Sequence, residues 1–233
     1  MKRIFDSYSL IARLFPSLLS LLPLFISWFY LRNQLGLEAL GNYLGNITFF
    51  GEISLSLIIL YAWSQLVRTT SKRLEERYFT KSQGFPTTYM LLTSGSGFSL
   101  QFKEQFRERV SSQYGLSLIS QEKELTDLDE AKKRINDAIR LIIRDHGDNP
   151  RVRRHNIWYG FSRNLCGGAI YGFLFSVVGV ILGKILGLPI LSIISLILAL
   201  PYAIIVIFRK EILVQHGEAY ARELVIEFMH NQK

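Results

Sequence analysis

One stretch of the chain gathers residue types that bind phosphates and stack on bases. Between residues 151 and 164, basic and aromatic side chains alternate without a single acid. Arginine forks match phosphate oxygens, and aromatic faces stack bases. The candidate nucleotide or oligonucleotide site consists of Arg151, Arg153, Arg154, His155, Trp158, Tyr159, Arg163 and Asn164. A positive, aromatic anchor beside a membrane helix has the same composition, so both interpretations stay open.

A second set of polar residues lies within or beside apolar segments. Glu52 shares a stripe with Thr48 and Ser56, and Lys184 lies near the end of a later segment. Three interpretations compete: a Glu52–Lys184 ion pair, separate contact of each charge with headgroups, or an aqueous path lined by Glu52. Ser20, on a serine face of the first apolar segment, could line the same path or simply hydrogen-bond to a neighbouring helix.

Small residues recur on one face of the third apolar segment. Glycines on one face let two helix backbones approach closely, which is a common basis of helix association in lipid. We therefore predict a packing strip against another helix or another subunit. Its glycines are Gly168, Gly172, Gly179, Gly183 and Gly187.

Four apolar segments must position these residues. They cover 14–30, 47–67, 165–188 and 189–208, close to the roughly 20 residues that cross a bilayer as a helix. Lys and Arg are concentrated in the tails and the middle stretch, which predicts that both termini and that stretch are cytoplasmic. The expected fold is an all-α membrane protein with four transmembrane helices in two pairs.

The expected domains follow from these segments. Residues 1–67 form a tail and the first helix pair, 68–164 a cytoplasmic domain, 165–208 the second pair, and 209–233 a cytoplasmic C-terminal helix. The cytoplasmic domain is expected to be mostly helical, with an α+β alternative left open by short strands near residues 89–93.

Two apolar stripes predict helices in the cytoplasmic domain. Lys103, Arg107 and Arg109 are expected off the first stripe, and Thr126 and Asp127 are expected to cap the second helix. The first stripe is Phe98, Phe102, Phe106, Val110 and Tyr114, and the second is Leu128, Ala131, Ile135, Ala138 and Ile142.

Composition and missing motifs exclude several classes of protein. A hydrophobic fraction of 49% excludes a disordered chain, and a net charge of +8 points to anionic partners. The single cysteine excludes an internal disulfide. The sequence has no phosphate-binding loop, nucleophile elbow or HExxH pair, so we expect neither an enzyme nor a cofactor. A metal site of His146 and His155 with Asp145 or Asp148 is the weaker alternative to a solvated loop.

Three short motifs carry a family resemblance. They are GFPTTYMLL at residues 84–92, LIIRDHG at 141–147 and HNIWYGFSRNLCG at 155–167. Together with the hydropathy layout, they resemble a family of bacterial four-helix membrane proteins. The sequence departs from the family pattern at Phe85, where a second glycine is usual, and at His155, where an acid is usual.

The family resembles membrane effectors of anti-phage systems of the Hailong type. The resemblance implies a homo-oligomeric inner-membrane ion channel, with a tetramer expected, gated by a nucleotide or oligonucleotide from a partner nucleotidyltransferase. The alternative function is a non-channel membrane scaffold that recruits a soluble effector or nucleic acid.

Overall fold

The structure, a computed structural model, divides into two compact units. It describes residues 8–34, 49–81 and 84–230, of which 86% are helical, with no strand in these ranges. Unit 1 comprises Met1–Leu74 and Gly160–Ile212, and unit 2 comprises Glu75–Tyr159 and Leu213–Lys233. The chain passes between the units three times, each time inside a helix: α3 (Phe49–Lys81), α8 (Pro150–Ile185) and α10 (Arg209–His230).

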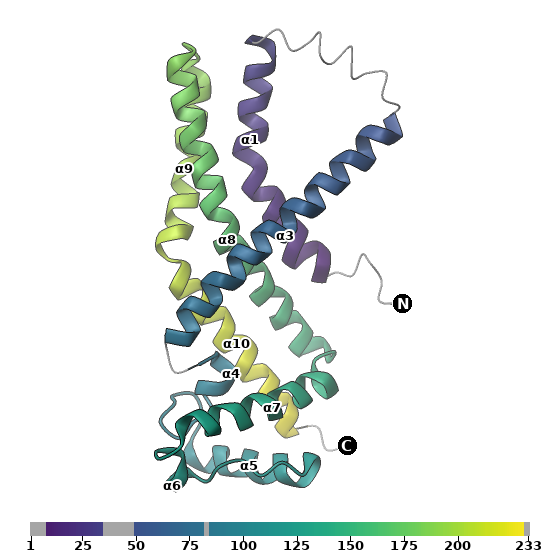
Figure 1. The fold of residues 1–233 in the computed structure, drawn as a ribbon, viewed down its shortest axis with the longest axis vertical. Helices are drawn as coiled ribbons and strands as arrows, with labels where there is room; N and C mark the ends of the chain where they lie inside the picture. The colour runs from purple at the N-terminus through teal and green to yellow at the C-terminus, as the bar shows by residue number, and fades with distance from the viewer. Residues whose placement is uncertain (1–7, 35–48, 82–83, 231–233) are drawn as a thin grey trace. The chain divides into compact units, whose positions relative to one another are not determined.

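Unit 1 contains the apolar helices. A π-helical turn, η1 (Ser9–Leu14), leads directly into α1 (Phe15–Gln34), and α9 (Pro189–Ile207) lies beside α8 (Figure 1). Within the described residues, three stretches are long and apolar enough to cross a membrane: Ser9–Arg32, Pro150–Ile185 and Pro189–Ile207. The predicted segment 47–67 begins outside the described residues, so the fourth crossing stays a prediction.

Apolar side chains of unit 1 point outward. On α9, Ile193, Leu196 and Leu200 are all more than half exposed, whereas Ser195 on the opposite face is fully buried. A helix in water shows the opposite arrangement, because water favours apolar side chains in the interior. An outer surface of this kind is typical of helices that face lipid.

Glycines of α8 lie against the neighbouring helices of unit 1. A Cβ added at Gly172 would come within 2.6 Å of the Tyr202 ring, and one at Gly179 within 2.4 Å of the Ser195 hydroxyl, both on α9. At Gly168 the nearest atom belongs to Ser20 of α1, at 3.2 Å. The strip therefore packs α8 against other helices of the same chain, chiefly α9 and α1.

Two glycines at the end of the strip have different roles. Gly183 approaches the backbone nitrogen of Ser192 on α9, since a Cβ there would lie only 2.8 Å from it. Gly187 was predicted to belong to the same strip, but it does not pack against another helix of this chain. It lies in the turn between α8 and α9 with a φ of 66°, and nothing comes within 4 Å of an added Cβ. As a glycine it readily adopts the left-handed backbone conformation that ends α8.

The cysteine of the chain is buried in unit 1. Cys166 has no exposed surface, and its Sγ lies 3.8 Å from the carbonyl oxygen of Arg209. A thiol in this position is a small apolar packing group.

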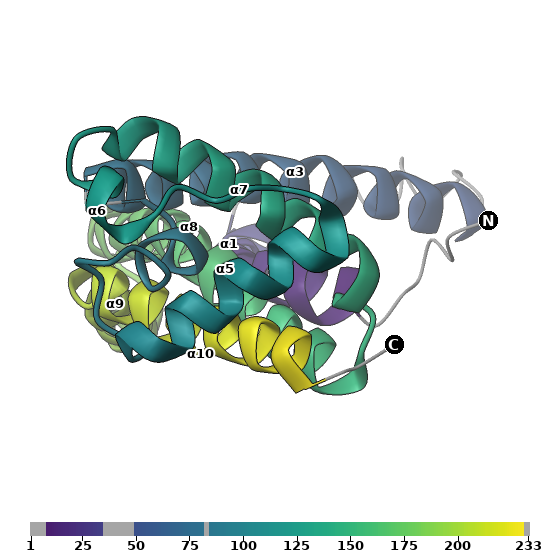
Figure 2. The same ribbon diagram turned by 90° about the horizontal axis from the view of Figure 1, so that it is seen from below.

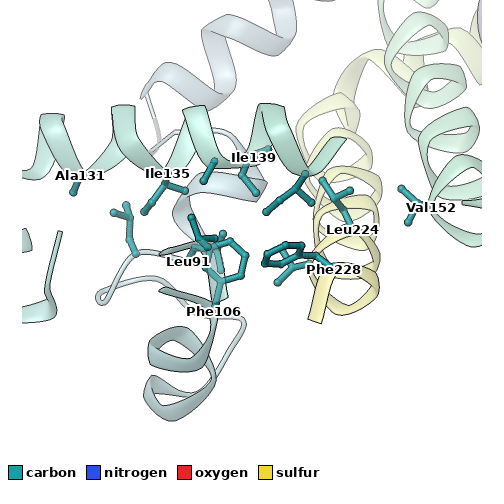
Figure 3. Packing of buried hydrophobic residues seen from close by; sticks show 13 residues of the cluster. Leu91, Phe106, Ala131, Ile135, Ile139, Val152, Leu224 and Phe228 are labelled. Carbon is teal, nitrogen blue, oxygen red and sulfur yellow. The ribbon is translucent and has the colours of Figure 1, made fainter. Parts of the chain in front are cut away.

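Unit 2 encloses an apolar core among short helices. It contains α4 (Pro86–Tyr89), α5 (Leu100–Tyr114), α6 (Gln121–Glu124) and α7 (Leu128–His146), together with the adjoining parts of α3, α8 and α10 (Figure 2). Figure 3 shows Phe106 of α5, Ile135 and Ile139 of α7 and Phe228 of α10 converging. The two predicted stripes therefore face this core, apart from Leu128, which is 38% exposed.

The caps explain where the helices of unit 2 begin and end. The Ser99 hydroxyl accepts a hydrogen bond from the Phe102 N–H at the start of α5, and the Asp127 carboxylate accepts one from Glu130 at the start of α7. Gly115 ends α5 with a φ of 66°. The short strands that the sequence left open near residues 89–93 do not form: Pro86 begins a helix there, and turns follow it.

Candidate functional site

The structure divides the predicted phosphate-binding segment between the two units. The whole segment lies on α8, but residues 151–159 belong to unit 2, whereas Arg163 and Asn164 belong to unit 1.

Two of these residues are engaged in packing. The Tyr159 hydroxyl donates a hydrogen bond to the Glu75 carboxylate, and its ring stacks on Tyr220 with centroids 6.0 Å apart. The Asn164 Nδ2 group is buried and donates to the Ala12 carbonyl oxygen at 2.5 Å. Neither side chain is oriented for stacking on a base.

One face of α8 in unit 2 still presents basic and aromatic groups to solvent. Arg151, Arg154 and Trp158 recur at spacings of three and four residues, which places them on one side of a helix. All three are exposed, and Trp158 keeps 51% of its surface accessible. We name these three residues the basic face. Arg153 and His155 are half-buried beside it.

Acidic groups lie close to one end of the basic face. Arg151 borders an open cleft of about 360 Å³ that also contains the carboxylates of Glu223 and Glu227. Asn149 donates to Glu227 there at 2.6 Å. Because carboxylates repel phosphates, Arg154 and Trp158 form the more favourable end of the basic face.

Buried charges organise the loop between α4 and α5. Lys103 is 1% exposed, and its Nζ donates to the carbonyl oxygens of Leu92 and Gly95, both at 2.6 Å. Burial lowers the pKa of Lys103. The ammonium group thus holds the chain reversal at the SGSG stretch in place.

A buried carboxylate completes this network. Glu124 is 2% exposed and accepts hydrogen bonds from the Thr93 N–H and hydroxyl at 2.6 Å each. The Arg107 guanidinium donates to the same carboxylate at 2.8 Å. We name Lys103, Arg107, Glu124 and Thr93 the buried ionic network.

The network adds burial to what the sequence predicted for α5. Lys103 and Arg107 do lie off the apolar stripe, as predicted, and both are buried. They lie four residues apart, so both reach the same loop from one side of α5. The spacing of four residues was the only sign in the sequence that these two charges act together. The periodicity of the apolar residues alone does not reveal that the charges are buried. Every charge has a partner, so the network is a structural clamp.

The structure shows a packing role for one predicted pore residue. The Ser20 hydroxyl donates to the Ser17 carbonyl oxygen at 2.7 Å and accepts from the Trp63 Nε1–H at 2.9 Å, which joins α1 to α3. Thr48 and the Glu52 side chain lie outside the described part of the chain. Ser56 and Lys184 are exposed on their helices. The Glu52–Lys184 pair and the aqueous path remain predictions.

The histidines do not gather with acids in the described residues. No group of three or more His, Cys, Asp or Glu side chains there is placed to hold a metal ion. His146 is buried and lies edge-on to the Phe228 ring, with centroids 5.7 Å apart. It therefore contributes to the apolar core of unit 2.

Known proteins add nothing to this geometry. No protein-family model, curated protein or solved structure matches the chain.

Proposed function

We propose that the chain is a homo-oligomeric ion channel effector of the bacterial inner membrane that acts in anti-phage defence. A nucleotide or oligonucleotide, made by a partner nucleotidyltransferase, binds the cytoplasmic side and gates the channel. Three apolar helices with outward apolar side chains support the membrane location. The defence role is supported by the resemblance of the motifs at residues 84–92 and 155–167.

The observation that carries the gating proposal is the helical character of all three connections between the units. The unit boundaries at 74/75, 159/160 and 212/213 fall inside α3, α8 and α10. A continuous helix passes on a rotation or shift of one end because its backbone hydrogen bonds link successive turns. Ligand binding to unit 2 can therefore bias two arrangements of unit 1.

The basic face is the proposed input site. Arg154 and Arg151 contact phosphates, and the exposed Trp158 ring stacks on a base. The face lies on α8, so binding acts directly on a helix that continues into unit 1.

The scaffold alternative is favoured by one contact. Ser20, predicted to line an aqueous path, is buried between α1 and α3 with its hydroxyl hydrogen-bonded. A protein that only recruits partners needs no aqueous path through unit 1.

Ion flux separates the two functions. Purified protein in liposomes loaded with a potassium-sensitive dye is mixed with a pool of short single-stranded oligonucleotides of mixed sequence. A channel gives flux that depends on the added oligonucleotides. The R151Q/R154Q variant loses this flux, because each phosphate contact is removed.

The matched control is R140Q. Arg140 is exposed on α7 of unit 2, with 81% of its side chain accessible, and lies outside the basic face. R140Q keeps the flux of the unaltered protein. Binding of oligonucleotides without any flux favours the scaffold, whereas equal flux in R151Q/R154Q and R140Q excludes the basic face as the input site.

A further inference from the structure

Three arginines of unit 1 follow a common pattern along the chain. Arg13 directly precedes the apolar segment 14–30, Arg68 directly follows 47–67, and Arg163 lies two residues before 165–188. They come from η1, α3 and α8 respectively. Of the three, only Arg163 belongs to the predicted phosphate-binding segment.

Contacts between the three helices bring these arginines to one level of unit 1. Ala12, next to Arg13, accepts a hydrogen bond from Asn164, next to Arg163. Val67, next to Arg68, lies 3.5 Å from a Cβ added at Gly168 on α8. Neighbours of all three arginines therefore touch α8 within about one and a half turns of it.

The electrostatics agree with this geometry. The pKa of Arg68 is lowered by burial, and next by the positive charges of Arg13 and Arg163. Repulsion of this kind falls with distance, so it marks guanidinium groups that lie near one another.

Arg13 and Arg68 each carry a buried donor that has no acceptor. The Nε–H groups of Arg13 and Arg68 are buried and make no hydrogen bond. No carboxylate in the described residues pairs with either side chain, and the contact of Arg13 is with the Tyr8 ring at 5.3 Å. Buried donors without acceptors and clustered like charges are both unfavourable.

We infer that Arg13, Arg68 and Arg163 form a binding site for a phosphate group at the end of the apolar helices of unit 1. A phosphate offers several acceptor oxygens and negative charge, which suit guanidinium donors from three directions. It can come from the headgroup of an anionic lipid or from free phosphate in solution. The lipid source rests on the proposed membrane location, since these arginines flank the segments where headgroups lie.

The test compares R13Q and R68Q with the unaltered protein in two kinds of nanodisc. One contains phosphatidylcholine alone, and the other also contains phosphatidylglycerol. Thermal unfolding and native mass spectrometry report stability and retained phosphatidylglycerol. In phosphatidylcholine alone, R68Q unfolds at the same temperature as the unaltered protein or higher, because one repelling charge is gone.

With phosphatidylglycerol the order of the unfolding temperatures reverses. The unaltered protein gains thermal stability, and each variant gains less and retains the lipid about tenfold more weakly. Inorganic phosphate added to phosphatidylcholine nanodiscs distinguishes the source: the same gain there identifies free phosphate, and no gain identifies the lipid. R73Q is the control. Arg73 is exposed on α3, the helix that carries Arg68, and R73Q behaves like the unaltered protein.

Two results overturn the inference. One is an equal loss of stability for R13Q and R68Q in both lipids, which means a purely structural role. The other is an unaltered protein that responds to neither phosphatidylglycerol nor phosphate. Should R68Q fail to fold, R68K keeps the charge without the planar fork and retains the lipid at an intermediate level. The lipid measurement does not depend on ion flux. A protein that conducts no ions but retains phosphatidylglycerol therefore contradicts the proposed channel and leaves the phosphate site standing.

Discussion

The two units of the molecule use the same kinds of side chain in opposite ways. In unit 2, leucine, isoleucine and phenylalanine fill a core around Phe106 and Phe228. In unit 1, most large apolar side chains point outward, while the interior holds glycines and hydroxyl groups such as Ser20 and Ser176. The difference follows from the surroundings: water drives apolar groups inward, whereas lipid leaves helices to associate by close contact.

Charges are also treated differently in the two units. Unit 2 buries charged groups and pairs them, as Glu124 does with Arg107. The described part of unit 1 buries hydroxyls that bond to nearby carbonyl groups, such as Ser17 and Ser176, and gathers its arginines where the apolar segments end. Substitutions should therefore destabilise the two units for different physical reasons.

The largest effect is expected in the glycine strip of unit 1. G172L inserts a side chain where the Tyr202 ring lies within 2.6 Å of an added Cβ, and that ring is fixed by a hydrogen bond from its hydroxyl to the Leu19 carbonyl oxygen. The helices must separate, at a cost of about 3 kcal/mol or more. Unfolding in detergent measures the loss.

V178L is the matched control for this change. Val178 is half-exposed on the outer side of the same helix, where a larger side chain has room. Equal stability of G172L and V178L would show that close contact does not hold unit 1 together.

The next effect concerns the buried ionic network of unit 2. E124Q removes the charge that accepts from Arg107 and Thr93, leaving a buried guanidinium without its counterion. The expected loss of stability is about 3 kcal/mol. Hydrogen exchange of the amides of α5 and α7 reports it.

E130Q tests whether burial is the cause. Glu130 pairs with Arg134 at 3.0 Å, but both side chains are at least 40% exposed. Water screens such a pair, so its loss costs under about 1 kcal/mol. A loss of similar size for both variants would contradict the contrast between buried and exposed charge.

The smallest effect is a pH dependence in unit 2. Burial, and next the charge of His155, lowers the pKa of His216 from its usual 6.5. The unfolded chain therefore binds more protons than the folded chain below about pH 6.5, and stability falls as the pH decreases. Thermal unfolding between pH 7.5 and 5.5 should show a steeper decrease for the unaltered protein than for H216Q.

H230Q serves as the comparison, because His230 is exposed at the end of α10. Its pH profile should match that of the unaltered protein. Identical profiles for H216Q and the unaltered protein would remove His216 as the cause.

Much of the helical architecture was predictable from periodicity and caps. The stripes around Phe106 and Ile135 predicted the two helices of the unit 2 core, and Asp127 marked the start of the second one. These signals are local, since each depends on side chains within a few turns. The same holds for the glycine strip, apart from Gly187, which lies in the turn after α8.

The candidate site was less predictable, because it depends on which helix face meets which neighbour. In the sequence, the residues of 151–164 form one uninterrupted basic and aromatic segment. On the helix, Tyr159 and Asn164 face neighbouring helices and pack against them, whereas Arg154 and Trp158 are exposed to solvent. The burial of Lys103 depends on the fold of a loop that it contacts from eight or more residues away. Arg13 and Arg68 could have been noticed by their equal positions beside apolar segments.

The buried Cys166 makes the protein convenient for site-directed labelling. Its thiol is enclosed in unit 1, and the chain has no other cysteine. Thiol reagents reach a group only where it is accessible as the thiolate, so the folded chain offers them little background. A cysteine introduced at an exposed position is then the readily labelled thiol, and Cys166 does not have to be replaced first. Membrane-impermeant reagents and spin labels can then report on either unit of an otherwise unaltered protein.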